Sequence, residues 1–297
     1  MKYDAIVIGA GFAGLSAALY LARARRQVCV IDVGSPRNRF TDASHGFLGQ
    51  DGRNPRDLIA DARRQVETYP SVRFIQGRAD IARGSKDNFT VALDTGVVLT
   101  SRRLVLAFGL TDLLPDLPGL PERWGKSVLA CPYCHGYEFA NRKLGVLHMG
   151  PMSAMQAALI ADWGPVTLYL NGHDRPDDDM LALLSSRDVH IEPSQVVGLD
   201  GTGTDLSEVL LAEGRRSSID ALYVAPPSQL NSTITTQLGC AIEAGRYGPV
   251  ITVDEVKMTT VDGVYAVGDI ARANNALIAA ADGATAGIAL HAGLVFN

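Results

Sequence analysis

The sequence predicts an α/β protein built from two Rossmann-like, three-layer dinucleotide-binding domains, the second inserted in the first. Three observations support this expectation. A βαβ pattern with a glycine-rich turn opens the chain, and a second βαβ pattern begins near Lys143. The third observation is a buried strand after Thr260, which ends in Gly268 and Asp269 and returns the chain to the first domain.

The first βαβ pattern has the fingerprint of a dinucleotide site. A buried strand over 3–8 runs into Gly-Ala-Gly-Phe-Ala-Gly, which opens a helix that extends through Ala24. The three glycines permit a tight turn, close approach of a pyrophosphate and close packing of helix on strand. A second strand over 27–31 is followed by Asp32, an acid placed to accept hydrogen bonds from a ribose diol. We therefore expect a dinucleotide whose phosphates lie at the helix N-terminus.

The rest of the first domain alternates loops, strands and one helix. The polar loop over 34–52 is long enough to suggest a function, and His45 in it could line the cofactor or the substrate entrance, or be an ordinary loop histidine. Ala79 follows a strand at the place where such domains pass the adenine. Further elements are expected over 54–69 (helix), 72–76 (strand), 89–93 and 97–99 (hairpin) and 104–109 (strand). Prolines after residue 113 mark a crossing into another domain.

The second βαβ pattern, over 143–170, retains the fold but not the fingerprint. The first and third glycine positions of its turn hold His148 and Ser153, with Gly150 between them. Because the close approach of a pyrophosphate depends on those glycines, we expect nucleotide binding by this domain to be lost or altered.

The residues after the second strand of this domain support the same view. Asn171 stands there, with neither an acid for a ribose nor an arginine pair for a 2′-phosphate. NADP(H) is therefore a doubtful cofactor, although His173 and Arg175 could still hold a 2′-phosphate weakly. A helix over 180–185 and strands over 189–192, 194–199, 206–211 and 219–224 are expected to complete the domain.

Cys131 and Cys134 are the closely spaced pair among four cysteines. A Cys-x-x-Cys pair alternates between dithiol and disulfide with little backbone movement, and the adjacent His135 can lower a thiol pKa. A zinc site would need further ligands, whereas Cys29 and Cys240 stand alone in apolar segments, so we expect no metal. A static disulfide is not required in so apolar a chain. Glutaredoxins carry Cys-Pro-Tyr-Cys just after their first strand, which the mid-chain position here does not match.

Composition excludes several classes of protein. A chain of 297 residues that is 47% apolar can bury the cores of two domains. A net charge of −5, without a basic stripe, argues against nucleic acid as a partner. The apolar stretch over 5–21 follows Asp4 and is interrupted by glycines, so it is not expected to be a signal peptide. No other stretch predicts a membrane span, and we expect a cytoplasmic protein.

Taken together, these motifs resemble the thioredoxin reductase family of low-molecular-weight flavoproteins. The glycine turn comes first, the Cys-x-x-Cys pair lies between the two dinucleotide folds, and Gly-Val-Tyr-Ala-Val-Gly-Asp ends at Asp269. The resemblance covers nearly the whole chain. It implies an FAD domain formed by residues 1–113 and 247–297, an inserted NAD(P)-binding-like domain over 114–246 that carries the cysteine pair, and a homodimer.

Three departures from the family pattern bear on function. Thioredoxin reductases usually have Asp after the second cysteine, an intact second glycine turn and an arginine pair, where this chain has His135, His148 and Asn171. Cys-Pro-Tyr-Cys-His-Gly-Tyr-Glu is instead similar to the flavin dithiol oxidases that close disulfides in small natural products such as gliotoxin and holomycin. Those enzymes pass electrons to dioxygen without NADPH. Ferredoxin-dependent flavin thioredoxin reductases also lack a working pyridine nucleotide site.

The resemblance assigns roles to the sulfurs. It implies that Cys134 faces the isoalloxazine ring of FAD and that Cys131 exchanges with substrate. We expect His135 to act as general base and acid, because an imidazole accepts protons near neutral pH, although it could merely satisfy a turn carbonyl.

Cofactor contacts are expected from both ends of the chain. A helix over 278–290, opened by Asn274 and its neighbours, is expected to point its N-terminus at the flavin, and the carboxylate of Asp269 can bind a ribityl hydroxyl. The expected cofactor-binding residues are Gly9, Gly11, Phe12, Ala13, Gly14, Asp32, Arg39, His45, Ala79, Ala107, Gly109, Gly268, Asp269, Asn275 and Ala276.

Three functions remain open on the sequence. The favoured one is an FAD-dependent thiol–disulfide oxidoreductase that oxidises dithiols with dioxygen and does not depend on NADPH. The second is a thioredoxin-disulfide reductase fed by NAD(P)H or ferredoxin. The third is a flavin-binding redox sensor. A small dithiol or disulfide, or a thioredoxin-like protein, is the expected substrate.

Overall fold

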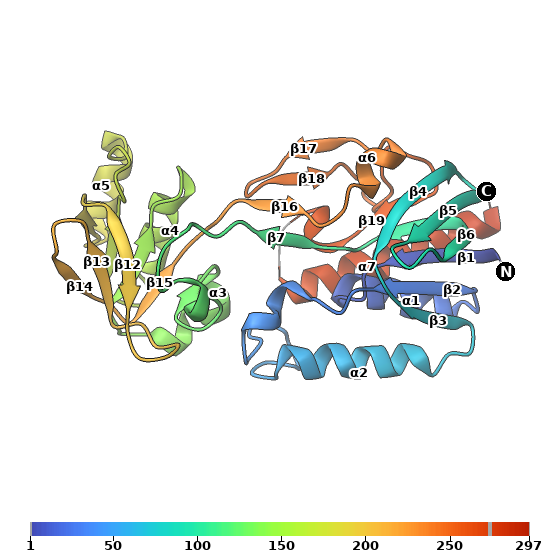
Figure 1. The fold of residues 1–297 in the computed structure, drawn as a ribbon, viewed down its shortest axis with the longest axis horizontal. Helices are drawn as coiled ribbons and strands as arrows, with labels where there is room; N and C mark the ends of the chain where they lie inside the picture. Colours follow the sequence, from blue (N-terminus) through green and yellow to red (C-terminus); the bar gives the residue numbers. More distant parts are fainter. Residues whose placement is uncertain (1, 273–274, 297) are drawn as a thin grey trace. The chain divides into compact units, whose positions relative to one another are not determined.

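The protein consists of two compact units. The computed structural model describes residues 2–272 and 275–296. The first unit comprises Met1–Arg39, Phe47–Asp112 and Ser228–Asn297, and the second comprises Phe40–Gly46 and Leu113–Pro227 (Figure 1). Each unit is a layered α/β structure, which confirms the predicted fold class.

The first unit is organised around a seven-stranded sheet in the order β3-β2-β1-β6-β5-β4, with β19 also paired to β6. Strands β1, β2, β3, β6 and β19 are parallel, and β4 and β5 extend the sheet as an antiparallel hairpin. The strands are β1 (Lys2–Ile8), β2 (Val28–Asp32), β3 (Val72–Gln76), β4 (Ala79–Ser85), β5 (Asn88–Leu93), β6 (Val98–Leu106) and β19 (Val264–Ala266).

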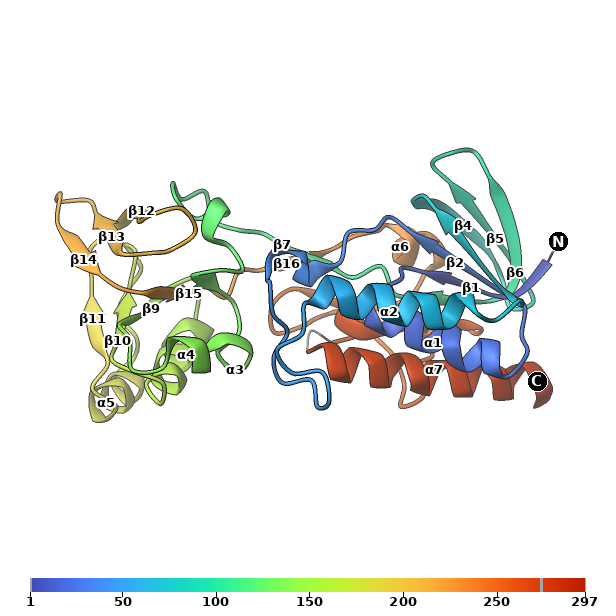
Figure 2. The same cartoon turned by 90° about the horizontal axis from the view of Figure 1, so that it is seen from below.

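Helices from both ends of the chain cover one face of this sheet. Helix α1 (Phe12–Arg23) packs against α2 (Pro55–Glu67) and along α7 (Ala276–Phe296) (Figure 2). Helix α7 is long and apolar enough to cross a membrane by those two criteria, but a side chain added at its Gly283 would overlap the carbonyl oxygen of Ala13 in α1. This close packing identifies α7 as the core helix of the first unit.

The other face carries short elements between the sheet and solvent. These are α6 (Ile234–Leu238), the paired strands β7 (Leu110–Asp112) and β16 (Ser228–Leu230), and the hairpin β17 (Ile242–Ala244) and β18 (Pro249–Ile251). The 3-10 turns η1 (Arg37–Phe40) and η4 (Gly268–Ile270) follow β2 and β19 along the chain. Apolar residues such as Ile234 and Ile251 pack here against Phe89 and Leu104 of the sheet.

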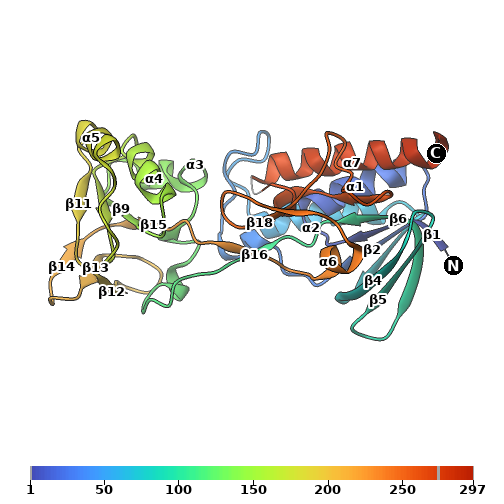
Figure 3. The same ribbon diagram turned by 90° about the horizontal axis from the view of Figure 1, so that it is seen from above.

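The second unit has three layers (Figure 3). Its five parallel strands run in the order β11-β10-β9-β15-β8, with α4 and α5 on one face and the antiparallel sheet β12-β13-β14 on the other. The elements are β8 (Val128–Leu129), β9 (Leu144–Leu147), β10 (Val166–Tyr169), β11 (His190–Glu192), β12 (Val196–Asp200), β13 (Glu208–Leu211), β14 (Arg216–Ser218), β15 (Ala221–Tyr223), α3 (Pro132–His135), α4 (Met152–Ile160), α5 (Asp178–Ser186), η2 (Pro121–Arg123) and η3 (Tyr137–Phe139).

The structure differs from the expected boundaries in three places. The segments predicted over 97–99 and 104–109 are one strand, β6, whose first half pairs with β5 and whose second half pairs with β19. We expected the chain to return to the first domain at 247, but it returns at Ser228, because β16 pairs with β7 and α6 packs on β4. Segment 40–46 also belongs with the second unit, not with the first.

The contact between α1 and α7 provides a stability test. Gly283→Ala places a methyl group on Ala13 O and should destabilise the first unit by about 1–3 kcal/mol. Gly293→Ala is a matched control in the same helix, since its methyl would meet only the Tyr265 hydroxyl at 3.7 Å. The control should gain up to about 1 kcal/mol from helix propensity. Urea denaturation followed by circular dichroism would measure both, and equal stability of the two variants would contradict the packing described.

Candidate active site

The glycine turn after β1 is closely packed on two sides and open on the third. Gly9 has φ +109°, and a side chain there would overlap Ala107 O, while one at Gly14 would overlap Gly9 O. Gly11 is the N-cap of α1, and an added Cβ would meet no atom within 4 Å. Backbone at Gly11 can therefore be approached by a phosphate, with the N–H groups of Phe12 and Ala13 at the positively polarised helix end.

Asp32 ends β2 beside this turn. Its carboxylate accepts hydrogen bonds from the backbone N–H of Ala10 at 3.0 Å and of Gly34 at 3.1 Å. Gly77 N donates to Asp32 O at 3.0 Å, which brings the start of β4, at Ala79, to the same edge of the sheet. The acid for a ribose and the expected adenine position thus lie together.

The closing strand contributes the opposite side of the cradle. Gly268 has φ +73°, and a Cβ there would lie 3.0 Å from the Cβ of Ala13. The side chain of Asn275 accepts a hydrogen bond from Ile278 N at 2.9 Å and so caps α7, whose first residue is Ala276. Asn274, also expected at this helix start, is outside the described residues.

Arg37 ties two parts of the cradle together, and the sequence analysis did not single it out. Its guanidinium donates to Asp269 at 2.9 Å and to both oxygens of Asp112, at 3.0 and 2.5 Å. Burial disfavours the charge, but these carboxylates outweigh that effect and raise the pKa of Arg37. The expected residue Arg39 instead donates to Pro36 O at 3.0 Å. Arg37 lies two residues before Arg39 in a turn, and no periodic sequence pattern distinguishes one arginine from the other.

Two further expected residues line the same region. Ala107 N donates to Ile8 O at 2.8 Å, directly beside the glycine turn, and Gly109 adopts a φ of +71°. The region thus offers backbone N–H groups that can donate to phosphates, a carboxylate that can accept from a ribose, and a second carboxylate after β19. These residues fit an adenine dinucleotide, FAD included.

The cysteine pair lies in the second unit, on the segment 130–136, which we call the Cys loop. Cys131 is the N-cap of α3 and Cys134 lies within it, and their sulfurs are 2.6 Å apart. Gly136 ends α3 where a side chain would meet the ring of Trp163 at 2.8 Å. Tyr133 packs edge-on against the same ring, with the centroids 5.7 Å apart. The Cys loop is therefore held against α4 and the segment that follows it.

The two thiols differ in acidity. The hydrogen bond from Cys134 lowers the pKa of Cys131 to about 7, against the opposing effect of burial, and the backbone N–H groups of Cys134 and Tyr133 lower it further. The same bond, burial and the nearby charges of Cys131 and Glu138 raise the pKa of Cys134. Cys131 is thus the nucleophilic sulfur at neutral pH.

His135 and His45 lie together at the Cys loop. Burial lowers the pKa of His135, Glu138 opposes this effect and His45 adds to it, so the imidazole is neutral at pH 7. The ring centroids of the two histidines are 6.3 Å apart, and His45 Nε2 lies 3.4 Å from Glu138 Oε1. His45 was expected to contact the cofactor; the structure places it with the sulfur pair because segment 40–46 packs with the second unit.

The second βαβ turn lacks the features of the first. The rings of His148 and His173 contact each other at a tilt of 48°, with centroids 5.0 Å apart, and burial together with His173 lowers the pKa of His148. The Ser153 hydroxyl accepts a hydrogen bond from Met149 N at 2.9 Å, and Asn171 Oδ1 accepts one from Val196 N at 3.0 Å. His148 and Ser153 thus occupy glycine positions of the turn, and an internally bonded Asn171 stands where a 2′-phosphate would need a cation.

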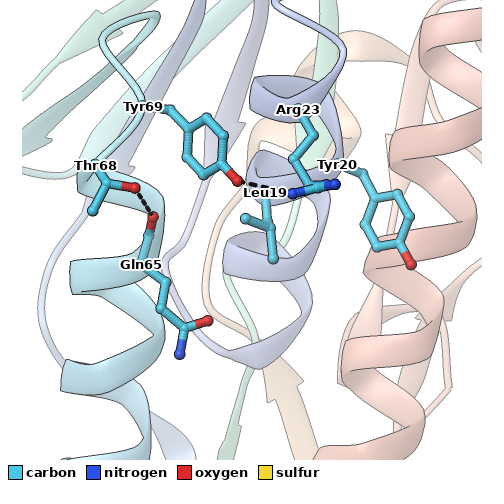
Figure 4. Close-up of a pocket in the computed structure, with 6 residues that line it drawn as sticks. All are labelled: Leu19, Tyr20, Arg23, Gln65, Thr68 and Tyr69. Atoms are coloured by element: carbon cyan, nitrogen blue, oxygen red, sulfur yellow. Dashed lines mark hydrogen bonds between the residues drawn. The ribbon is translucent and has the colours of Figure 1, made fainter.

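No cluster of three metal-ligating side chains occurs among residues 2–272 and 275–296. Cys29 and Cys240 are buried in the first unit, and burial raises the pKa of both thiols, that of Cys29 to about 11. The pocket in Figure 4, lined by Tyr20, Arg23 and Tyr69 among others, lies at the C-terminal ends of α1 and α2, opposite the glycine turn.

Comparison with known proteins decides the family. The family model for pyridine nucleotide-disulphide oxidoreductases matches residues 3–285. The chain belongs to this family. Members of the family are oxidoreductases that bind FAD, and the cradle described above fits that cofactor.

Relatives of this family member include enzymes and solved structures. A thioredoxin reductase of Claviceps purpurea, tcpT, is 34% identical over 90% of this chain and 86% of its own length. The crystal structure of an oxidoreductase from Agrobacterium tumefaciens is 45% identical, with a TM-score of 0.95 over 100% of this chain and 99% of that one. The crystal structure of HlmI is 41% identical, with a TM-score of 0.92 over 99% of this chain and 93% of that one.

Flavin binding by this oxidoreductase can be tested at Gly11. The residue has extended backbone and free space around it, so Gly11→Val should fold normally but block the phosphate approach. We expect the purified variant to have lost most of its flavin absorbance while its circular dichroism spectrum stays unchanged. Gly11→Ala, with a smaller side chain, should show a partial loss. A Gly11→Val protein with full flavin content would contradict this location of the phosphates.

Thiol acidity is a second test. Alkylation of Cys131 by iodoacetamide in the reduced protein should rise with pH through about 7, because only the thiolate reacts. Cys134→Ala removes the hydrogen bond that contributes most to this acidity and should move the profile to higher pH by about one unit or more. The alkylated residue is identified by mass spectrometry. A profile that stays in place would mean that Cys134 does not set the acidity.

Proposed function

We propose that the protein is an FAD-dependent thiol–disulfide oxidoreductase that oxidises dithiols to disulfides, with dioxygen as the terminal electron acceptor and without NADPH. The observation that carries the proposal is the Cys loop itself. It combines a nucleophilic Cys131, its partner Cys134 and a neutral imidazole at His135, within a unit whose own nucleotide turn is altered.

The sulfur pair performs the exchange with substrate. One substrate thiolate attacks the Cys131 sulfur of the enzyme disulfide, which breaks the Cys131–Cys134 bond and leaves a thiolate on Cys134. The second substrate thiolate attacks the substrate sulfur of this mixed disulfide, so the substrate leaves as a disulfide and Cys131 leaves as a thiolate. Bound FAD would supply the acceptor for the two electrons now held by the pair, with dioxygen as the terminal oxidant and hydrogen peroxide as its two-electron product.

The protons of this exchange need an acceptor at the Cys loop. His135 can take a proton from a substrate thiol because burial keeps its imidazole neutral. Glu138 and His45 lie on its other side, and a proton accepted by His135 is stabilised by the Glu138 carboxylate, which raises the imidazole pKa. A neutral base suits oxidation of thiols at neutral pH.

The altered second turn supports independence from NADPH. Asn171 stands where the first cation for a 2′-phosphate is expected, His148 and Ser153 occupy glycine positions of the turn, and Arg175 lies exposed in the following loop.

A reductase is the second candidate. The relative tcpT is named a thioredoxin reductase, and Gly150 in the second unit leaves its turn open to approach by a ligand. In that case electrons would flow from NAD(P)H or ferredoxin through FAD to the disulfide of thioredoxin or of a small molecule. A redox sensor in which the pair only switches state is the third.

The surface of α7 supports the homodimer that we also propose. Leu277, Ile288 and Val295 are exposed along one side of this helix, at spacings of eleven and seven residues that keep them on one face. Burial of this apolar face against a second copy would remove it from water.

Anaerobic mixing separates the first two functions. We expect a small dithiol to bleach the flavin and NADPH or NADH to leave it oxidised, and we expect dithiol-dependent oxygen consumption in air. Cys131→Ser should abolish both dithiol reactions, and His135→Ala should slow them about 100-fold or more. The rate of the wild-type protein should fall at acid pH, because the imidazole of His135 is then protonated and cannot accept a proton. Rapid bleaching by NADPH would establish the reductase instead, and no reaction with any thiol or disulfide would favour the sensor.

A further inference from the structure

Two buried polar atoms behind the Cys loop have no hydrogen-bond partner in the described chain. One is the hydroxyl of Tyr223, a donor and acceptor, and the other is Gln156 Oε1, an acceptor. Buried polar side chains are nearly always paired, so each of these atoms calls for an explanation.

The fold places Tyr223 directly against the strand that leads into the Cys loop. Tyr223 ends β15 and is in register with Leu129 of β8, and Val224 N donates to Leu129 O at 2.8 Å. The tyrosine side chain packs in the same apolar cluster as Leu129 and Ala157 of α4. It therefore lies on the α4 side of the sheet, as the Cys loop does.

Gln156 of α4 reaches the Cys loop from the same side. Its Nε2 donates to Ala130 O at 2.9 Å, one residue before Cys131. The carboxamide thus fixes the loop with its nitrogen and leaves its oxygen unpaired, on a helix whose residues Ala154 and Ala157 pack in the same apolar cluster as Tyr223.

The charged neighbours of the phenol are the redox groups. Burial raises the pKa of Tyr223, and Cys131, Glu138 and Cys134 raise it further in that order. The phenol consequently remains protonated at neutral pH and keeps a proton to donate. The other titratable groups at the Cys loop are His135 and His45, both held on the side of Glu138.

A buried tyrosine hydroxyl without a hydrogen-bond partner makes the folded protein less stable than a phenylalanine at the same position would. Tyr169, a buried tyrosine in β10 of the same sheet, differs in this respect, because its hydroxyl hydrogen-bonds Ser217 Oγ at 2.7 Å. A hydroxyl group that lowers the stability of one state of the protein is explained if it forms a hydrogen bond in another state. In the structure the two sulfurs are free thiols joined by one hydrogen bond, and loss of the acidic proton of this pair creates such a state, because it places a negative charge on the sulfurs.

We propose that the Tyr223 hydroxyl donates a hydrogen bond, directly or through one water shared with Gln156, to the sulfur pair once the pair has lost its acidic proton, and so stabilises the thiolate. The proposal deepens the proposed function, since it takes the pair as the redox centre. Tyr223 then acts on the acidity of the pair and not on its position. No bond is made or broken to the tyrosine, and its proton stays on oxygen.

Tyr223→Phe and the matched control Tyr169→Phe test this role without turnover. The purified holoprotein is reduced, and the lower thiol pKa is measured from the pH dependence of iodoacetamide alkylation. Tyr223→Phe should raise that pKa by about one unit and slow alkylation several-fold near pH 6.5, whereas Tyr169→Phe should leave the thiol pKa unchanged. Thermal melting of the oxidised proteins is the second measurement.

The melting experiment has opposite expectations for the two variants. Tyr223→Phe should melt no lower than the wild type, because it removes a hydroxyl without a partner, and Tyr169→Phe should melt lower, because it leaves Ser217 unpaired. An unchanged thiol pKa in Tyr223→Phe, an equal shift in both variants, or destabilised oxidised Tyr223→Phe would each overturn the proposal. A protein that shows the pKa shift but no thiol turnover would refute the proposed function alone.

Discussion

The two ends of the chain meet at a contact that only glycine permits, and the flavin cradle depends on it. The carbonyl oxygens of Gly9 and Ala13 lie where side chains at Gly14 and Gly283 would have to be, so α1 can pack closely on both the glycine turn and α7. This packing brings the segment after β19, with Asp269, to the carboxyl edge of β1. Arg37 then ties Asp269 to Asp112, at the end of the strand that leads out of the first unit.

The second unit has the architecture of a nucleotide-binding domain and carries the sulfur pair. Its parallel sheet places a loop at the carboxyl end of β8, that loop carries the sulfurs, and the turn after β9 holds histidine and serine where glycines would allow phosphate to approach. Acidity within the Cys loop is set locally, because the two thiols share a proton and the imidazole beside them is kept neutral by burial. The resulting asymmetry distinguishes the more acidic sulfur, Cys131, from its partner.

Sequence reasoning worked where one strong local rule decides the structure. The glycine turn, Asp32, the strands over 3–8 and 72–76 and the Cys-x-x-Cys pair all follow from short patterns, and the structure places Gly268 and Ala107 against that turn and the start of α1. It missed β4, β14 and the elements between 228 and 246, which are short and specified by pairing partners far along the chain. The roles of Arg37, His45 and Gln156 depend on contacts across 25 or more residues, which no periodicity reveals.

The contact of Trp163 with the Cys loop gives the protein an intrinsic optical reporter. The sequence contains two tryptophans, and Trp124 is buried among apolar residues such as Leu120 and Val128. Trp163 instead touches Tyr133, and a side chain at Gly136 would collide with it, so its indole lies on the segment that bears the sulfurs. A rearrangement of the Cys loop would change the surroundings of this one indole, so we expect its fluorescence to report on the loop in real time, with no label attached.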